Sequence, residues 1–375
     1  MATSVSQARP VAPQLPTGLD TPCLVIDLDI VERNARRMAD AVAARGIALR
    51  PHVKTHKSVA LARMQIEAGA VGITVGTLGE AEVMAEGGIN DILLAYPLWA
   101  DGQKGARLSA LNERDGLRFA VGVDSVAGAE RLASAVSGST RPLRVAIELD
   151  PHYHRTGVDP ATTGELAREV RDMGLEVIGV FTHGGHVYRG RDAVPEAAAD
   201  EVGAIATAAE SLRAAGIEPE LLSAGSTPTA LSAATEPVNE VRPGTYLIND
   251  RIQVHMGSCS PDGVAIAVAA TVVSDAAPGK FVINAGAKSL TKDMPPYLTG
   301  YGFLPEYPEG VLERLSDYHG EVRISDGAAA PRIGDVVAVI PNHVCPVIDL
   351  FDSFLATRSG EIVGRWPVDA RGRSG

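Results

Sequence analysis

Short apolar runs rich in β-branched residues recur eight times over the first two thirds of the chain, and this repeat constrains the fold most. The runs lie near residues 47, 70, 91, 117, 143, 176, 220 and 245. The segments between them, such as residues 78–88 and 125–138, have the periodicity of amphipathic helices. Strands that alternate with helices form parallel sheets, and eight such units predict a (β/α)8 TIM barrel.

The pattern changes beyond about residue 250, which predicts a second, mostly β domain. Runs such as residues 264–274 and 335–344 are β-rich, are separated by Gly, Pro and Asp, and have little helical periodicity. The opening residues 21–29 are also strand-like, so we expect them to join this domain. A chain of 375 residues is longer than one compact core usually accommodates, so we expect two domains. The sequence thus predicts an α/β fold with a barrel over residues 25–250 and a β domain over residues 1–24 plus 251–375.

Composition excludes several classes of protein. A formal net charge of -12 gives no electrostatic reason to bind nucleic acid or an anionic membrane. The first twenty residues contain no apolar signal region, and no run reaches the 18 apolar residues of a membrane span. Three cysteines, Cys23, Cys259 and Cys345, cannot form a fully paired disulfide framework. We therefore expect an acidic cytoplasmic protein, with Cys23 in a core and Cys259 in a loop.

Polar residues gather where the predicted barrel strands end, which is where such barrels carry their chemistry. They are His52, Lys54, His56, Arg155, His183 and His186. Lys54 lies in the segment RPHVKTHKS between two histidines. Cationic or desolvating neighbours lower the pKa of an amine, and a neutral amine attacks aldehydes or removes a Cα proton. The alternative is that Lys54 and Lys57 are ordinary solvated charges.

The sequence resembles the fold-type III pyridoxal-phosphate enzymes related to alanine racemase, in the branch of D-threonine aldolase and D-serine dehydratase. The resemblance extends from about residue 20 to 370. Its motifs here are TPCLVIDLD, RPHVKTHK, HRTGV, THGGHVY, SAGSTPT, EVRPGTY and PNHVCPVIDL. RPHVKTHK and PNHVCP together are specific, whereas either Gly-containing loop alone would be weak.

The resemblance implies that Lys54 binds pyridoxal 5'-phosphate covalently and later acts as the Cα base. The SAGSTPT loop, with EVRPGTY behind it, would hold the cofactor phosphate through backbone N–H groups and hydroxyls. The residues it assigns to the cofactor are Lys54, His52, Arg155, His183, Tyr188, Gly225, Ser226, Thr227 and Tyr246. Where the family often has a glycine triplet this chain has Ser223, Ala224 and Gly225, which leaves the number of free backbone donors open. For Arg155 the alternative is a surface ion pair.

His343 and Cys345 form a candidate metal pair. One residue separates them in a strand-like run, so we expect both side chains on the same face. Imidazole and thiolate suit Zn2+, and two protein ligands leave positions for water and substrate, as in a catalytic site. The alternative is that Cys345 is a small buried residue and His343 a satisfied core histidine. In the family this run often continues to Asn-Leu, whereas this chain has Asp349 in place of the asparagine. Three roles for Asp349 stay open: a third metal ligand, a neighbour of the ligands, or a carboxylate that faces solvent.

The resemblance implies a lyase. In the branch, dehydratases carry His-x-Cys, as here, whereas aldolases more often carry His-x-Asp, which suits Mn2+ or Mg2+. We expect elimination of water from a D-3-hydroxy amino acid, such as D-serine, D-threonine or D-3-hydroxyaspartate, to give a 2-oxo acid and ammonia. The first alternative is an aldolase, which would cleave the substrate by a retro-aldol reaction to glycine and an aldehyde. A racemase and a non-catalytic cofactor carrier are further alternatives, but such carriers lack the β domain. By resemblance alone, we also expect a homodimer. His152 and His154 belong to a loop at the barrel mouth, and we assign them no role.

Overall fold

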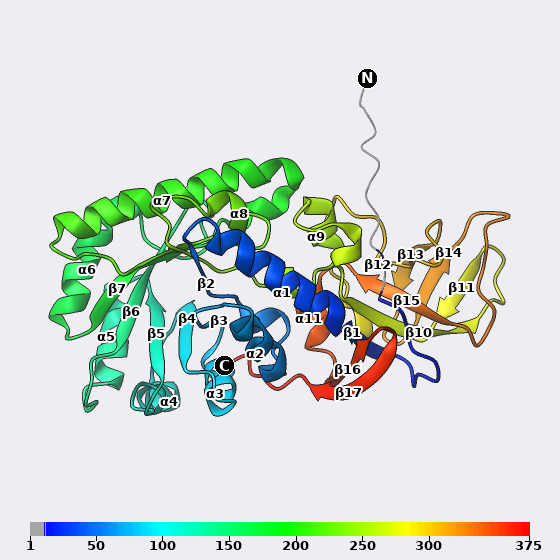
Figure 1. The fold of residues 1–375 in the computed structure, drawn as a ribbon, viewed down its shortest axis with the longest axis horizontal. Coiled ribbons are helices and arrows are strands. Elements are labelled where there is room, and N and C mark those ends of the chain that lie inside the picture. Colours follow the sequence, from blue (N-terminus) through cyan, green and yellow to red (C-terminus); the bar gives the residue numbers. More distant parts are fainter. Residues whose placement is uncertain (1–10, 12) are drawn as a thin grey trace, which may run out of the picture. The chain divides into compact units, whose positions relative to one another are not determined.

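The computed structural model describes residue 11 and residues 13–375, coloured along the chain in Figure 1. The expected absence of an export signal concerns residues 1–20, of which residues 1–10 and 12 lie outside the described residues. Within the described residues, no helix combines the length and the apolar character that crossing a bilayer requires.

The chain forms two compact units. We call Met1–Arg36, Thr55–Ser58 and Thr245–Arg371 the β unit, and Arg37–Lys54, Val59–Gly244 and Gly372–Gly375 the barrel unit. The predicted domain bounds at residues 24 and 250 stay a prediction. Helix α1, Leu28–Ala43, begins in the β unit and ends in the barrel unit.

Eight parallel strands make up the barrel unit, as the sequence predicts. They are β2 Ala48–Leu49, β3 Ile73–Val75, β4 Asp91–Pro97, β5 Arg118–Val123, β6 Arg144–Leu149, β7 Glu176–Thr182, β8 Leu221–Ala224 and β9 Glu240–Val241. Their order is β2-β9-β8-β7-β6-β5-β4-β3, and a parallel bridge between His52 and Thr74 joins the two ends of this order. The prediction of a TIM barrel is confirmed.

One predicted strand is misplaced. The eighth strand is β9, whereas residues 245–247 form the 3-10 turn η5. Arg242 still bonds through its backbone N–H to the β8 end, but Pro243 follows and has no N–H to donate, so the ladder ends there.

Helices follow the barrel strands, and Figure 1 shows α4 to α7 flanking β4 to β7. The helices are α2 Val59–Glu67, α3 Leu78–Glu86, α4 Gly102–Asn112, α5 Val126–Ala135, α6 Thr163–Asp172, α7 Val194–Ala214 and α8 Ala230–Ala233, with 3-10 turns η1 Val53–Thr55, η2 Pro160–Thr162, η3 Gly185–Arg189 and η4 Arg191–Ala193. Side-chain caps start several of them: the Thr77 hydroxyl accepts from Glu80 N and the Ser125 hydroxyl from Gly128 N. A buried cluster around Leu93, Ala146 and Phe181 is part of the core.

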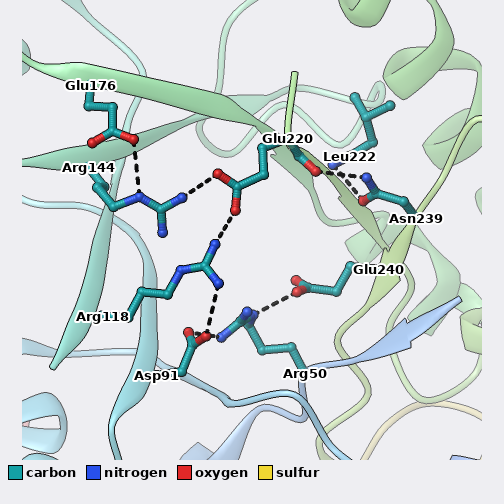
Figure 2. A network of polar contacts seen from close by, with 9 residues as sticks. All are labelled: Arg50, Asp91, Arg118, Arg144, Glu176, Glu220, Leu222, Asn239 and Glu240. Atoms are coloured by element: carbon teal, nitrogen blue, oxygen red, sulfur yellow. Dashed lines mark hydrogen bonds and ion pairs between the residues drawn. The ribbon is translucent and has the colours of Figure 1, made fainter. Parts of the chain in front are cut away.

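A network of ion pairs joins Arg50, which follows β2, to residues at the amino ends of β4 to β9 (Figure 2). Buried Arg50 donates to Glu240 at 2.7 Å and to Asp91 at 2.5 Å. Arg118 continues the network from Asp91 to Glu220, and Arg144 from Glu220 to Glu176. Barrel enzymes carry their chemistry at the opposite, carboxyl ends, so we assign this network to stability.

The β unit is built on a second sheet, in the order β13-β14-β11-β10-β1-β16-β17, with β15 beside β10 and β12 beside β15. Its strands are β1 Cys23–Asp27, β10 Ile266–Ser274, β11 Lys280–Ile283, β12 Gly302–Phe303, β13 Val311–Leu315, β14 Gly320–Arg323, β15 Val336–Pro341, β16 Ser353–Arg358 and β17 Glu361–Pro367; its short helices are α9 Arg251–Met256, α10 Ala287–Leu290 and α11 Val344–Ile348, with 3-10 turns η5 Thr245–Leu247 and η6 Pro261–Gly263. The opening strand β1 pairs antiparallel with β10 and parallel with β16. Cys23 is buried in β1, and Cys259 is buried in the loop after α9.

Candidate active site

Lys54 is the exposed side chain of a buried turn. It lies in η1, directly after β2, and the residues on both sides, Val53 and Thr55, are buried. The backbone N–H of Lys54 points at His52 Nδ1, at 3.4 Å. The backbone is therefore fixed while the amine stays accessible, as covalent capture of an aldehyde requires.

His183 is a neutral imidazole at the carboxyl end of β7. Its pKa is well below the usual value, first because of burial and then because Lys54, Arg155 and Arg242 add positive charge nearby. The loop after it is anchored where Gly184 N donates to the buried carboxylate of Glu201 at 2.8 Å. The structure thus brings Lys54, Arg155 and His183 into one electrostatic environment within the barrel unit.

Arg155 pairs with a buried carboxylate. Its guanidinium lies 3.6 Å from Glu148 Oε1 and over the ring of Tyr153. Burial raises the pKa of Glu148, although the hydroxyl of Thr156 donates to it at 2.9 Å. Arg155 itself is half exposed, so its guanidinium edge remains accessible from solvent.

The predicted phosphate loop follows β8. Gly225 has φ +79, and an added Cβ would lie 3.1 Å from both Ala230 Cα and Val241 Cγ1, so glycine is required there. Ser226 N already donates to the Thr229 hydroxyl at 2.9 Å. Ser226 and Thr227 are buried. The loop therefore offers hydroxyls and a tight turn, and the N–H of Ser226 is already engaged within it.

Further polar residues at the carboxyl ends of the barrel strands have ion-pair or hydrogen-bond partners that the sequence alone does not reveal. His186, on η3, lies 3.1 Å from Asp200 Oδ2, and His154 Nδ1 lies 2.7 Å from Asp150 Oδ2. Tyr188, on η3, is exposed, at 38% of its surface. Arg242 is buried and donates to Ser223 Oγ and to the Thr182 carbonyl oxygen, both at 2.5 Å.

Three predicted site residues belong to the β unit: Tyr246, His343 and Cys345. Tyr246 is buried in η5. Its predicted role at the phosphate, and the pairing of the metal residues with the barrel residues in one reaction, stay predictions.

The reason given for the His343–Cys345 pair is wrong, although the two side chains do meet. Strand β15 ends at Pro341, His343 precedes helix α11, and Cys345 lies in its first turn. The helix begins here because Val344 N donates to the carboxylate of Asp250 at 2.9 Å. A hydrogen bond still joins the His343 and Cys345 side chains. Both are partly exposed, which disfavours the alternative of two core residues.

Carboxylates surround His343. Its Nδ1 lies 2.6 Å from Asp293 Oδ2. Burial lowers the pKa of His343, but Asp293, Cys345 and Asp250 outweigh burial and raise it to about 11. The same contact lowers the pKa of Asp293. With Nδ1 held by Asp293, a metal ion would bind Nε2 by displacing the proton that the raised pKa of His343 keeps on the imidazole. Among the described residues, no group of three or more His, Cys, Asp and Glu is placed to hold a metal.

Asp250 is a site residue that sequence reasoning missed. It is fully buried, and its two oxygens accept from Gln253 N, at the start of α9, and from Val344 N, at the start of α11. Burial raises its pKa to about 6. An Asp before a helical segment is an N-cap signal, but its second partner lies 94 residues away.

Comparison with known proteins shows the family. A family model described as "Alanine racemase, N-terminal domain" matches residues 26–251, and one described as "Putative serine dehydratase domain" matches residues 265–357. The chain belongs to the alanine racemase-like family of fold-type III pyridoxal-phosphate enzymes. The resemblance inferred from the motifs is thereby confirmed.

Relatives within the family match nearly end to end. The chain is 37% identical over 370 residues to a D-threo-3-hydroxyaspartate dehydratase of Delftia sp. (strain HT23), covering 93% of this chain and 97% of that protein. It is 32% identical to a D-threonine aldolase of Arthrobacter sp., and the match covers 95% of this chain and 94% of that protein. A crystal structure of D-threonine aldolase from Filomicrobium marinum superposes with a TM-score of 0.88 at 31% identity, covering 98% and 100%. Both activities expected from the motifs thus occur among the relatives, and both are lyase activities.

Proposed function

We propose that the protein is a pyridoxal-phosphate- and zinc-dependent lyase that eliminates water from a D-3-hydroxy amino acid, giving a 2-oxo acid and ammonia. The observation that carries the proposal is the contact between His343 and Cys345, which presents one nitrogen and one sulfur donor. The similarity to a D-threo-3-hydroxyaspartate dehydratase supports it.

The barrel residues fit pyridoxal phosphate. Lys54 would hold it covalently, Gly225 permits the tight turn beside its phosphate, and Ser226 and Thr227 would offer hydroxyls. The bound cofactor would supply an electron sink for the pair of electrons left at Cα. Lys54 Nζ would take the Cα proton. A neutral His183 would line the cofactor without adding a positive charge.

The β unit's donors fit zinc better than the harder ions. A thiolate favours Zn2+, whereas Mn2+ and Mg2+ prefer oxygen ligands. His343 would bind through Nε2, because Asp293 holds Nδ1, and Cys345 would bind through Sγ. The ion would supply Lewis-acid polarisation of the substrate's β-hydroxyl. A solved variant of a D-threo-3-hydroxyaspartate dehydratase is described as being in the metal-free form, which supports metal binding in that relative.

Retro-aldol cleavage is the second candidate, favoured by the superposition on a D-threonine aldolase. It would use the same lysine and the same metal, but the β-hydroxyl would lose its proton and the Cα–Cβ bond would break. Glycine and an aldehyde would then replace the oxo acid and ammonia.

A product assay tests the proposal. The purified protein, loaded with pyridoxal phosphate and Zn2+, is given D-serine, D-threonine or D-threo-3-hydroxyaspartate, with Lys54→Ala as control. Oxo acid and ammonia that are lost with EDTA and in the variant would support it. Glycine and aldehyde would move the enzyme to the aldolases, and no product from any substrate would overturn the substrate class.

The proposal includes a homodimer in the cytoplasm that acts on a small D-amino acid. Light scattering on the purified protein measures its molar mass in solution and so tests the oligomeric state. The mass of a monomer at assay concentrations would contradict the homodimer.

A further inference from the structure

Asp349 forms an ion pair with the buried Lys57. Both of its carboxylate oxygens accept from Lys57 Nζ, at 2.9 and 2.7 Å. The Lys57 side chain is only 7% exposed and that of Asp349 34%. Lys57 also has φ +50, and its carbonyl oxygen accepts from Ala370 N at 3.0 Å. The ion pair therefore holds a constrained, buried piece of backbone.

This backbone is the segment Thr55–Ser58, which continues directly from Lys54. It belongs to the β unit and makes two contacts with helix α11. Thr55 Oγ1 lies 3.3 Å from Cys345 Sγ, and Lys57 pairs with Asp349, four residues and thus about one turn further along. The helix that carries a proposed metal ligand is thereby fixed to the residue after the proposed cofactor lysine.

We propose that the Lys57–Asp349 ion pair, together with the Thr55–Cys345 contact, is a positioning device that couples metal binding at Cys345 to cofactor binding at Lys54. The inference rests on the proposed cofactor and metal sites, but not on which reaction they perform. Lys57 and Asp349 are positioning residues, because they act through the backbone of Thr55–Ser58. Among the side chains of this segment, that of Lys57 carries the fixed positive charge, and both oxygens of Asp349 accept from it.

Coupling of two binding sites is reciprocal. We define the coupling ratio as the dissociation constant of pyridoxal phosphate without metal divided by that with saturating Zn2+. The dissociation constant of pyridoxal phosphate is determined from the absorbance of the lysine-linked cofactor, once without metal and once with saturating Zn2+. In the wild-type protein we expect zinc to tighten cofactor binding about 10-fold, within the range usual for coupled sites. The dissociation constant of zinc, measured with a competing chromogenic chelator, must shift by the same factor when cofactor is present.

Asp349→Asn removes the counter-charge with almost no change in shape. We expect its coupling ratio to fall to within about 2-fold of one. The matched control is Asp317→Asn, which removes the same charge from a carboxylate that is 72% exposed and also pairs with a lysine, Lys288, at 3.4 Å. The control must keep the wild-type ratio. A pair that only stabilises the fold would lower the unfolding temperature of Asp349→Asn and leave the ratio unchanged.

A second variant covers the case in which Asp349→Asn does not fold. Thr55→Val introduces no unpaired charge and removes the hydroxyl beside Cys345, so its ratio should also approach one. An unchanged ratio in Thr55→Val or in a folded Asp349→Asn, or no coupling in the wild-type protein, would overturn the inference. Wild-type coupling that the variants abolish, without lyase products, would instead overturn the proposed function and leave the positioning device in place.

Discussion

Replacing Arg50 with methionine should destabilise the barrel unit far more than the same change at Arg118, although both arginines belong to one network (Figure 2). The Arg50 side chain is 10% exposed and its partner Glu240 5%. Arg118 and its partner Glu220 are 51% and 53% exposed. The comparison tests burial, because the residue type and the substitution are the same and both arginines pair with Asp91.

The magnitudes follow from what each change leaves behind. Without Arg50, Glu240 stays buried with the Ser223 hydroxyl as a donor at 2.8 Å. Losing one partner of a buried ion pair costs about 3–5 kcal/mol. Asp91 keeps Arg118, so we expect the lower end, about 3 kcal/mol. An exposed pair contributes about 1 kcal/mol or less, which sets the expected cost of Arg118→Met.

Thermal unfolding followed by circular dichroism measures both costs. For a domain of this size, about 3 kcal/mol lowers the midpoint by roughly 6–12 °C, whereas Arg118→Met should lower it by at most about 4 °C. Product formation well below both midpoints should stay near the wild-type rate, because neither arginine is among the residues proposed to hold the cofactor, the metal or the substrate. Equal shifts in the two variants would refute the argument that burial decides the cost.

Further predictions concern the carboxylates of the β unit. Asp293→Asn removes the acceptor that orients His343, so Zn2+ affinity measured by chelator competition should fall about 10- to 100-fold; an unchanged affinity would contradict the orienting role. Burial raises the pKa of Asp250 from 3.8 to about 6, so the folded state binds its proton more tightly than the unfolded chain. The contribution of this proton to the free energy of unfolding is therefore fully present below pH 3.8 and is lost as the pH rises through 6. Its size is roughly 2–3 kcal/mol. Urea titrations of the metal-free protein between these pH values should show a flatter slope in Asp250→Asn, and an equal slope would assign the pH dependence elsewhere.

Periodicity predicted the barrel because every strand is a local apolar run followed by a local helix. It missed β9, since the run at residue 245 is as apolar as a strand and only the missing N–H of Pro243 ends the ladder before it. The lysine turn was predictable because Lys54, His52 and His56 are neighbours in sequence.

The surroundings of the metal pair could not be predicted, because they depend on contacts between distant residues. Where the sequence predicted a strand, helix α11 begins at Val344, whose N–H donates to Asp250, 94 residues away. Asp293 lies 50 residues from His343, and Lys57 lies 292 residues from Asp349. No periodicity links such positions, so their partners become visible only in the folded chain.

The most direct test of the account is the ratio of ammonia to glycine released from D-threo-3-hydroxyaspartate by the protein loaded with pyridoxal phosphate and Zn2+. The account predicts ammonia in excess, matched by an equal amount of 2-oxo acid and abolished in Lys54→Ala. Glycine in excess, or ammonia that persists in Lys54→Ala, would contradict it.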